Sequence, residues 1–371
     1  MSDKTTHTVT ITGYNSDGEG VARLESGRVV FVRGAARGDV LEVSLTSERS
    51  GVARAEIVRI ITSSPYRIET DCAFFPECGG CDYRHITYEE ELYAKRQCVN
   101  DALKRIGGLT TQVDQVLHTG QINGYRNKAV LHSDGSTSGF YRTRSHDVIP
   151  IEKCLLLKDD LNYAIKELSK THIGSKSEIT LRSGRYGTKQ PLEFELDSLI
   201  FGVTGFFQVN TEAALLLFHK AREYAALSKS DTLVDLYCGV GALTLFIGRD
   251  AGYALGVEQN DDSIETAREN AFRNNISHIE FIKADAAKWT ADIHEPDCVI
   301  VDPPRKGLSQ TAVCKILDIS PKRLVYVSCN PATMARDLKE LKGFRVREVC
   351  AVDMFPRTAN VECCCLLLRE S

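Results

Sequence analysis

The chain has 371 residues, of which 43% are hydrophobic and 26% charged, and this length favours two or three domains with separate cores. Its formal net charge of −4 excludes a uniformly basic protein, so any nucleic-acid surface must come from local grouping of the 46 Lys and Arg residues. The N-terminus MSDKTTHTVT lacks the apolar core of a signal peptide, and no apolar run is long enough to span a bilayer. We therefore expect a cytoplasmic protein, in which thirteen cysteines do not indicate a disulfide scaffold.

The first part of the chain, residues 1–62, is predicted to form a small β-barrel. Short β-rich runs are separated by Gly, Asp and Ser: HTVTITGY, GRVVFVRG, DVLEVSLTSE and ARAEIVRII. They predict four or five strands. Basic and acidic residues are equal in number here, so RNA binding would require the arginines to share one face. A solubilising module is the alternative.

Residues 63–204 are predicted to form a mixed α+β central domain. A helix over residues 87–108 begins at Thr87, with Glu90 reaching back to complete the cap, and ends at Gly107-Gly108. This helix is a candidate to pack on the C-terminal domain. Strand-like runs follow it: KAVLHS, HDVIPI, SEITLRS and LEFEL.

A cysteine-rich segment lies at the start of the central domain, where CAFFPECGGC spaces three thiols as Cys72-x5-Cys78-x2-Cys81. The distant Cys154 can supply a fourth thiolate, whereas His85 belongs to no His pair with zinc-finger spacing. Four thiolates suit either zinc or an iron–sulfur cluster, and the spacing alone leaves both open. Most other cysteines are expected to be buried small apolar residues: Cys98, Cys298, Cys314 and Cys350.

From residue 205 to residue 371, strands and helices alternate, which predicts a Rossmann-like α/β domain with a parallel sheet. The run TLVDLYCGVGALTLFIG is an apolar strand, a glycine turn and a helix. Gly239 and Gly241 would let the backbone approach a ligand at the carboxyl end of that strand. The spacing is not G-x-G-x-x-G, and no Lys-Ser/Thr follows as a phosphate loop requires.

Acidic residues mark the ends of four successive strands of this domain: Asp235, Glu258, Asp285 and Asp302. Glu258 suits the two hydroxyls of a ribose, and Asp285 suits the exocyclic amine of an adenine. Each residue alone would be an ordinary helix cap. As a series at the strand ends, they indicate a site for S-adenosylmethionine.

Two further residues suggest the chemistry of that site. The fifth strand ends in Ser-Cys-Asn-Pro with Cys329, and Glu362 lies in an apolar run, where a carboxylate is costly without a task. A thiolate that adds to carbon 6 of a uracil makes carbon 5 nucleophilic towards a sulfonium methyl. A base must then remove the carbon-5 proton so that the thiolate can leave. Cys329 is the candidate nucleophile and Glu362 the candidate base, with a buried strand-end cysteine as the alternative for Cys329.

The motifs FFQVN, DLYCGVG, VDPPRKG, SCNPAT and FPRTANVE occur in this order, and with them the chain resembles the RNA uracil-5-methyltransferase family over nearly its whole length. The resemblance implies a methyl transfer from S-adenosylmethionine that gives 5-methyluridine in structured RNA. It also implies that Cys329 is the nucleophile and Glu362 the base. Contacts with S-adenosylmethionine are implied for Gln208, Tyr237, Glu258, Asp302 and, less uniformly in the family, Asp285.

The resemblance extends to the first two domains. GYNSDGEGVAR and VVFVRGAARGD make the N-terminal barrel similar to a TRAM domain, a small RNA-binding barrel. The four cysteines match a [4Fe–4S] ligand set of many family members, which favours the cluster over zinc. Basic and aromatic residues interleave in GYRNKAVLHS and GFYRTRSHDVIPIEKC, as phosphate contacts beside stacked bases require. One departure is Asn360, which cannot titrate near neutrality where the family usually has His.

The sequence therefore predicts a monomeric RNA (uracil-5-)-methyltransferase with no membrane association. The TRAM-like barrel favours 23S ribosomal RNA over uridine 54 of transfer RNA as the target. Three alternatives differ in chemistry. A cytosine-5 enzyme would carry a second cysteine after Pro, and an amino-group enzyme an aromatic residue in place of Arg305. A non-catalytic iron–sulfur protein that binds RNA would need neither Cys329 nor Glu362.

Overall fold

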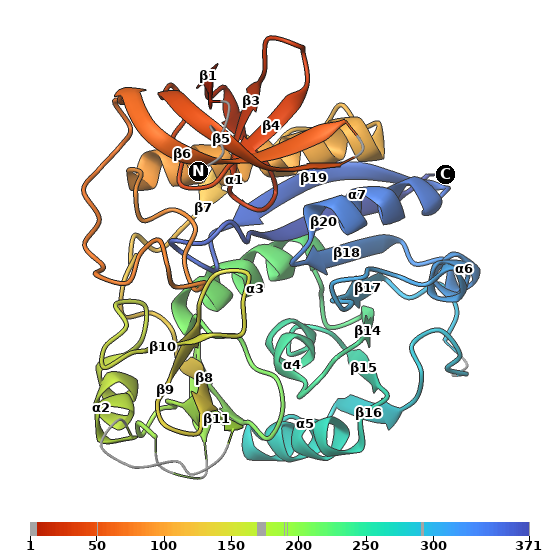
Figure 1. Ribbon diagram of the computed structural model, residues 1–371. Helices are drawn as coiled ribbons and strands as arrows, with labels where there is room; N and C mark the ends of the chain where they lie inside the picture. Colours follow the sequence, from red (N-terminus) through yellow and green to blue (C-terminus); the bar gives the residue numbers. More distant parts are fainter. Residues whose placement is uncertain are drawn as a thin grey trace.

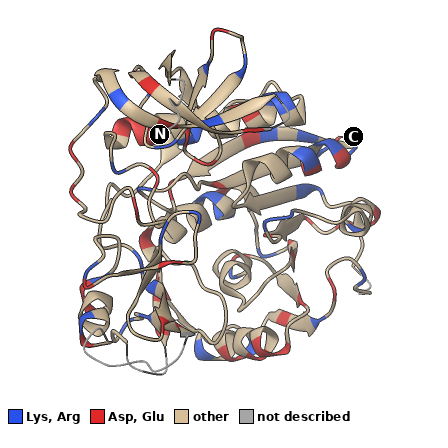
Figure 2. Ribbon diagram, viewed as in Figure 1, with Lys and Arg blue, Asp and Glu red and all other residues tan. Residues whose placement is uncertain are grey.

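The computed structural model describes residues 6–49, 51–168, 176–188, 190, 192–290 and 293–370. Figure 1 shows an N-terminal sheet above a large C-terminal sheet, with a smaller central sheet beside it. Lys and Arg are interspersed with Asp and Glu over all three parts (Figure 2), in keeping with the small net charge. None of the helices within these ranges is both long and apolar enough to cross a membrane.

The N-terminal part is a six-stranded sheet around its own core. In the order β1-β5-β6-β4-β3-β2, its strands are β1 (Thr6–Thr10), β5 (Val40–Arg49), β6 (Val52–Thr62), β4 (Val29–Val32), β3 (Gly20–Arg23) and β2 (Gly13–Tyr14). Alternate residues of a strand point inward, such as Val30 and Val32 on β4. The inward residues of β1, β3, β4, β5 and β6 form one core. Six strands replace the expected four or five because the run HTVTITGY divides into β1 and β2, and because GVAR, outside the four β-rich runs, forms β3.

Helix α1 (Tyr88–Asp101) begins where the sequence predicts, but its cap differs. Thr87 Oγ1 accepts a hydrogen bond from the Glu90 N–H at 3.3 Å, as expected. The Glu90 carboxylate does not return to Thr87, because it accepts two bonds from Arg37 of the N-terminal part at 2.7 and 2.8 Å. The helix continues as one π-helical segment, η1 (Ala102–Gly107), and ends at Gly108 in the left-handed conformation.

The central part is an antiparallel sheet in the order β10-β9-β8-β11. Its strands are β8 (Lys128–Asp134), β9 (Ser138–Tyr141), β10 (Val148–Pro150) and β11 (Lys176–Arg182). Ala129 and Leu131 on β8 pack against Leu161 and Ile165 of α2 (Asp159–Leu168), which covers one face of the sheet. A separate hairpin, β12 (Glu193–Leu196) and β13 (Leu199–Gly202), leads into the C-terminal part.

The C-terminal part is built on an eight-stranded sheet in the order β16-β15-β14-β17-β18-β20-β19-β7. Its strands are β7 (Val116–Leu117), β14 (Thr232–Leu236), β15 (Tyr253–Glu258), β16 (Ile279–Lys283), β17 (Cys298–Val301), β18 (Arg323–Ser328), β19 (Phe344–Val352) and β20 (Glu362–Arg369). Neighbouring strand residues such as Leu233 and Val234 point into opposite cores, so both faces of the sheet are buried. Because β7 pairs with β19, a segment that precedes the central sheet completes this one.

Helices cover both faces of the large sheet (Figure 1). One face carries α3 (Thr211–Ala225), α4 (Ala242–Gly248) and α5 (Asp261–Arg273). The other face carries α6 (Gln310–Ile319) and α7 (Pro331–Glu340), and η1 packs on α7. The parallel strands β14, β15, β17 and β18 all end at one edge of the sheet, where open α/β folds bind their ligands.

The prediction that four cysteines are buried apolar residues is only half right. Cys298 and Cys350 are buried, whereas Cys98 is half-buried and Cys314 is exposed. Helix α6 turns Ala312, Val313 and Ile316 towards the core, which leaves Cys314 on its outer face. The helical period explains this difference, because Cys314 lies two residues from both Ala312 and Ile316, about 200° around the helix from each.

Candidate active site

A cavity of about 590 Å³ lies at the edge of the large sheet where the parallel strands end. Its walls come from segments far apart in the sequence: the FFQ segment before α3, the ends of β14, β15 and β17, the β18–α7 turn and the start of β20. Four of the five predicted cofactor contacts line it: Gln208, Tyr237, Glu258 and Asp302. Cys329 and Glu362 line the same cavity, so the structure brings the candidate catalytic pair and the cofactor residues together.

Asp285 is the predicted cofactor residue that does not line this cavity. It follows β16, is exposed, and accepts a hydrogen bond from the Ala287 N–H at 2.9 Å. Its backbone oxygen also accepts from Lys288 and Trp289. Asp285 therefore stabilises the turn after β16, as an ordinary capping residue does.

The turn after β14 has the backbone that a close ligand requires. Tyr237, Gly239 and Gly241 have φ values of 72°, 53° and 78°. A Cβ at Gly241 would lie 2.9 Å from a ring carbon of Phe281, so packing excludes any larger residue there. A Cβ at Gly239 would meet nothing within 4 Å, so the backbone at this position is open to a ligand.

Buried carboxylates give this cavity its polarity. Asp235 Oδ2 accepts from Thr244 at 2.5 Å, while its buried Oδ1 has no hydrogen-bond partner among the described residues. Burial, opposed by Thr244, raises the pKa of Asp235 to about 8, and burial raises that of Asp302 to about 6. Glu258 Oε2 accepts from the Gly239 N–H at 3.2 Å, which ties β15 to the glycine turn. An unpartnered carboxyl oxygen among acidic groups fits a cationic ligand such as S-adenosylmethionine, because a bound cation favours the ionised forms of these groups.

Strand pairing places Cys329 beside Glu362. β20 runs antiparallel to β18, and Ser328 pairs with Cys363 in this ladder. The next residue in each direction is Cys329 on one chain segment and Glu362 on the other, so both reach the sheet edge together. Asn330 caps α7 through bonds from the N–H groups of the next turn, which ends the strand directly after the thiol.

Arg305 also lines this cavity, although the sequence predicts no role for it beyond the absence of an aromatic residue after Asp-Pro-Pro. It is the sole Lys, Arg or His among the described residues that line the cavity. Burial and the Glu362 carboxylate raise the pKa of Cys329, and the Arg305 guanidinium opposes this shift. Burial and Asp302 raise the pKa of Glu362 well above its usual range, again opposed by Arg305. The signal in the sequence was the arginine that directly follows Asp-Pro-Pro.

Asn360, the departure noted in the sequence, has a defined partner. Arg305 Nη2 donates to Asn360 Oδ1 at 3.0 Å. A side-chain amide therefore holds the cation that faces both Cys329 and Glu362. Because an amide keeps its accepting oxygen at every accessible pH, this contact does not depend on protonation.

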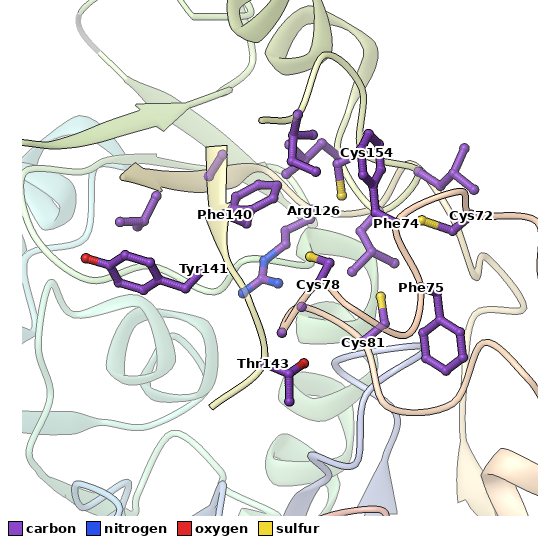
Figure 3. A pocket seen from close by; sticks show the side chains of 18 of the residues that line it. Cys72, Phe74, Phe75, Cys78, Cys81, Arg126, Phe140, Tyr141, Thr143 and Cys154 are labelled. Atoms are coloured by element: carbon purple, nitrogen blue, oxygen red, sulfur yellow. The ribbon is translucent and has the colours of Figure 1, made fainter. Parts of the chain in front are cut away.

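The four predicted metal ligands line a second cavity of about 520 Å³ in the central part. Figure 3 shows the sulfur atoms of Cys72, Cys78, Cys81 and Cys154 directed towards a common space, and all four thiols are free. Burial raises the pKa of Cys81 to about 12, and neighbouring thiols add to this effect. Within the described ranges, however, no three His, Cys, Asp or Glu side chains are arranged to hold a single metal ion.

Arg84 supplies a buried cation to this second cavity. Its Nη1 donates to Asp71 at 2.6 Å and its Nη2 to Asn123 at 3.0 Å. The buried Nε has no partner in the part of the chain that the structure describes. Arg84 also interacts with the Cys81 thiol and opposes the rise in its pKa that burial causes. A buried cation beside four thiols fits a bound group with net negative charge, such as an iron–sulfur cluster held by four thiolates.

Comparisons with known proteins agree with this architecture. Three family models match: "TRAM domain" over residues 4–58, "Methyltransferase small domain" over 205–326 and "tRNA (Uracil-5-)-methyltransferase" over 290–370. An uncharacterized RNA methyltransferase of Bacillus cereus is 33% identical, with 95% of this chain and 94% of that protein aligned. One of Clostridium tetani is 32% identical over 98% and 96% of the two chains.

Among solved structures, the tRNA (uracil-54, C5)-methyltransferase of Pyrococcus abyssi in complex with S-adenosyl-L-homocysteine superimposes with a TM-score of 0.79. The two sequences are 27% identical, and the superposition covers 98% of this chain and 99% of the P. abyssi chain. The likeness thus spans all three parts of the fold, and the N-terminal sheet is a TRAM domain. Sequence identity along the whole length, together with the matching C-terminal domain, makes this chain a member of the S-adenosylmethionine-dependent RNA uracil-5-methyltransferase family.

Proposed function

We propose that this enzyme methylates carbon 5 of a uridine in structured RNA through a covalent bond between Cys329 and carbon 6 of the base. The observation that carries the proposal is the β18–β20 register, which sets Cys329 and Glu362 side by side in the cavity that Asp235, Glu258 and Asp302 line. A uridine inside folded RNA must leave its stack to reach this thiol. The cavity opens at the sheet edge, where a flipped base can enter.

Each residue of the pair has one task in this reaction. The Cys329 sulfur bonds to carbon 6, and the electrons of the 5,6 double bond move towards the carbonyl as an enolate. S-adenosylmethionine supplies the methyl group as an electrophile, which carbon 5 accepts. Glu362 then removes the proton from carbon 5, and the electrons of that C–H bond restore the double bond and expel the thiolate. Arg305 favours the ionised forms of Cys329 and Glu362.

Glu362→Gln tests this assignment, because an amide cannot remove the carbon-5 proton. We expect methyl transfer without release, so that a protein–RNA adduct persists on a denaturing gel. Cys329→Ala should form no adduct and no 5-methyluridine. Cys314→Ala, which removes the exposed thiol of α6, is the matched control and should behave as wild type. Free methylated RNA at the wild-type rate from Glu362→Gln would rule out Glu362 as the base.

For the target, we propose 23S ribosomal RNA, and uridine 54 of transfer RNA is the second candidate. The TRAM domain supports RNA binding in general. The tRNA enzyme of P. abyssi has the same architecture over 99% of its length, and this observation favours the second candidate. Methylation of ribosomal and tRNA transcripts with labelled S-adenosylmethionine separates the two. Labelled tRNA alone would refute the ribosomal target.

We further propose that Cys72, Cys78, Cys81 and Cys154 hold a [4Fe–4S] cluster, with zinc as the second candidate. Four free thiols around one cavity and the buried Arg84 cation beside them support the cluster. The proposed reaction contains no redox step, so the role of the cluster is structural. Anaerobic purification should give a brown protein with iron and acid-labile sulfide in equal amounts. Stoichiometric zinc without iron would contradict the cluster.

A further inference from the structure

The loop that carries the candidate base is fixed by other parts of the chain. We define this base loop as residues 353–361, between β19 and β20. The buried Lys95 ammonium donates to Phe355 O at 3.1 Å, and the Tyr125 hydroxyl donates to Pro356 O at 2.9 Å. The N–H groups of Asp82 and Tyr83 both donate to Arg357 O, at 2.9 and 3.2 Å. Three successive carbonyls of the loop are therefore held from outside the C-terminal sheet.

Asp82 binds the loop close to the base. Its Oδ2 accepts a hydrogen bond from the Ala359 N–H at 3.0 Å, three residues before Glu362. Together with the bond from its own N–H to Arg357 O, this contact grips the loop at two points. Asp82 directly follows Cys81, so the same short segment faces the cysteine cavity and the base loop.

The TRAM domain closes over this contact. A Cβ built at Gly18 would lie 3.0 Å from Asp82 Cβ and 3.2 Å from Ala359 Cβ. Gly18 has a φ of 76°, which also favours glycine. All three parts of the fold thus meet where Asp82 binds the loop, and the contact has little room to shift.

We propose that Asp82 is a positioning residue that sets the place of Glu362 for removal of the carbon-5 proton. This inference rests on the proposed function, in which Glu362 is the base. Without the Asp82 carboxylate, the Ala359 N–H loses its acceptor. The last turn before Glu362 is then held by the bonds to Arg357 O and by the bond from Arg305 to Asn360 Oδ1. Cys329 is placed by β18 and α7, so nucleophilic attack and methyl transfer keep their geometry.

Asp82→Ala should therefore slow one step of the reaction rather than all of them. We expect steady-state turnover to fall by about 10- to 100-fold, the range that small misplacements of a reacting group produce. The fraction of RNA trapped as a covalent adduct should rise at the same time, while methyl transfer in a single turnover stays near wild type. Asp82→Asn should restore turnover and remove the adduct, because its carboxamide oxygen can accept the same bond.

Two controls separate positioning from general damage. Metal content per chain is measured for each variant, because Asp82 follows a proposed ligand. Tyr125→Phe removes the bond to Pro356 O without changing Asp82. This variant should trap less adduct than Asp82→Ala but more than the wild type. If Asp82→Ala does not fold, Tyr125→Phe decides in its place, and adduct at the wild-type level in that variant overturns the proposal.

Two results with a folded, metal-loaded Asp82→Ala overturn the inference: wild-type turnover, or a loss of turnover without adduct. An Asp82→Asn variant that is as slow as Asp82→Ala overturns it as well. Glu362→Gln distinguishes a failure of the positioning role from a failure of the proposed chemistry. If Glu362→Gln traps adduct and Asp82→Ala does not, only the positioning role fails. If neither traps adduct, the proposed chemistry fails with it.

Discussion

The groups around the Cys329 thiol have opposite effects on its pKa. Burial, Glu362 and Asp302 oppose its ionisation, and Arg305 is the group that favours it. The cation is itself held by Asn360, at the end of the base loop. Activation of the nucleophile is thus shared between the turn after β17 and the loop before β20, which the sequence separates by more than fifty residues.

Arg305→Met should move the pH dependence of adduct formation to higher pH. Because the pKa of Cys329 is already raised, the thiolate fraction grows with pH through neutrality, roughly tenfold per unit below that pKa. Loss of the cation raises this pKa further, so the rate near pH 7 falls and part of it returns above pH 9. The measurement is the single-turnover rate of adduct formation in a Glu362→Gln background. Arg305→Lys is the conservative control, and an unshifted profile for Arg305→Met would contradict the role.

One face of the central sheet packs on α2, and side chains of the other face line the cysteine cavity, among them Lys128, His132 and Tyr141. Lys128 and His132 on β8 point away from the α2 core and are half-buried. Lys128 lies directly opposite Arg182 of β11, an arrangement of like charges that destabilises a sheet. Neither forms an ion pair within the described residues, and burial lowers the pKa of both. Beside these two cations, the rings of Tyr141 and His132 stack with their centroids 3.7 Å apart. Unpaired cations next to aromatic rings suit an RNA strand.

Lys128→Ala and Arg182→Ala should each weaken RNA binding and reduce its dependence on salt. Removing one phosphate contact lowers the slope of log K against log salt by about 0.7 to 0.9. The rate of methyl transfer in the bound complex should not change, because both residues lie outside the cavity of Cys329. Lys220→Ala is the matched control, since Lys220 already pairs with Glu223 and Glu348. Filter binding over a range of salt concentrations checks this, and an unchanged slope would refute RNA contact at these positions.

Much of the molecule could be predicted because its signals are local. The alternation of strands and helices, the glycine turn and the residues after each strand define an α/β sheet and its ligand edge. Gln208, Tyr237, Glu258, Asp302, Cys329 and Glu362 all reach one cavity for this reason. Asp285 follows the same local rule but lies outside the cavity walls, because a strand-end carboxylate can also cap its own turn.

The features that could not be predicted depend on long-range contacts. No pattern around Glu90 indicates that Arg37 will take its carboxylate from Thr87. The two residues of β7 are too few to read as a strand, and their partner β19 lies more than two hundred residues away. The contact of Asp82 with Ala359 could not be predicted from the sequence either, since Ala359 contributes only a backbone N–H. Such contacts join the three parts of the fold into one site.

The register of β20 makes the run Cys363, Cys364 and Cys365 a spacer whose length matters more than its chemistry. All three thiols are buried, and they alternate between the two cores of the sheet. Substitution by another small apolar residue keeps this alternation. Deletion of one cysteine would change the composition very little, yet it would turn Glu362 to the opposite face while Leu366 and Leu367 kept their places. The number of residues in this run therefore sets the position of Glu362 relative to Cys329. Insertions and deletions here should abolish function more readily than substitutions do.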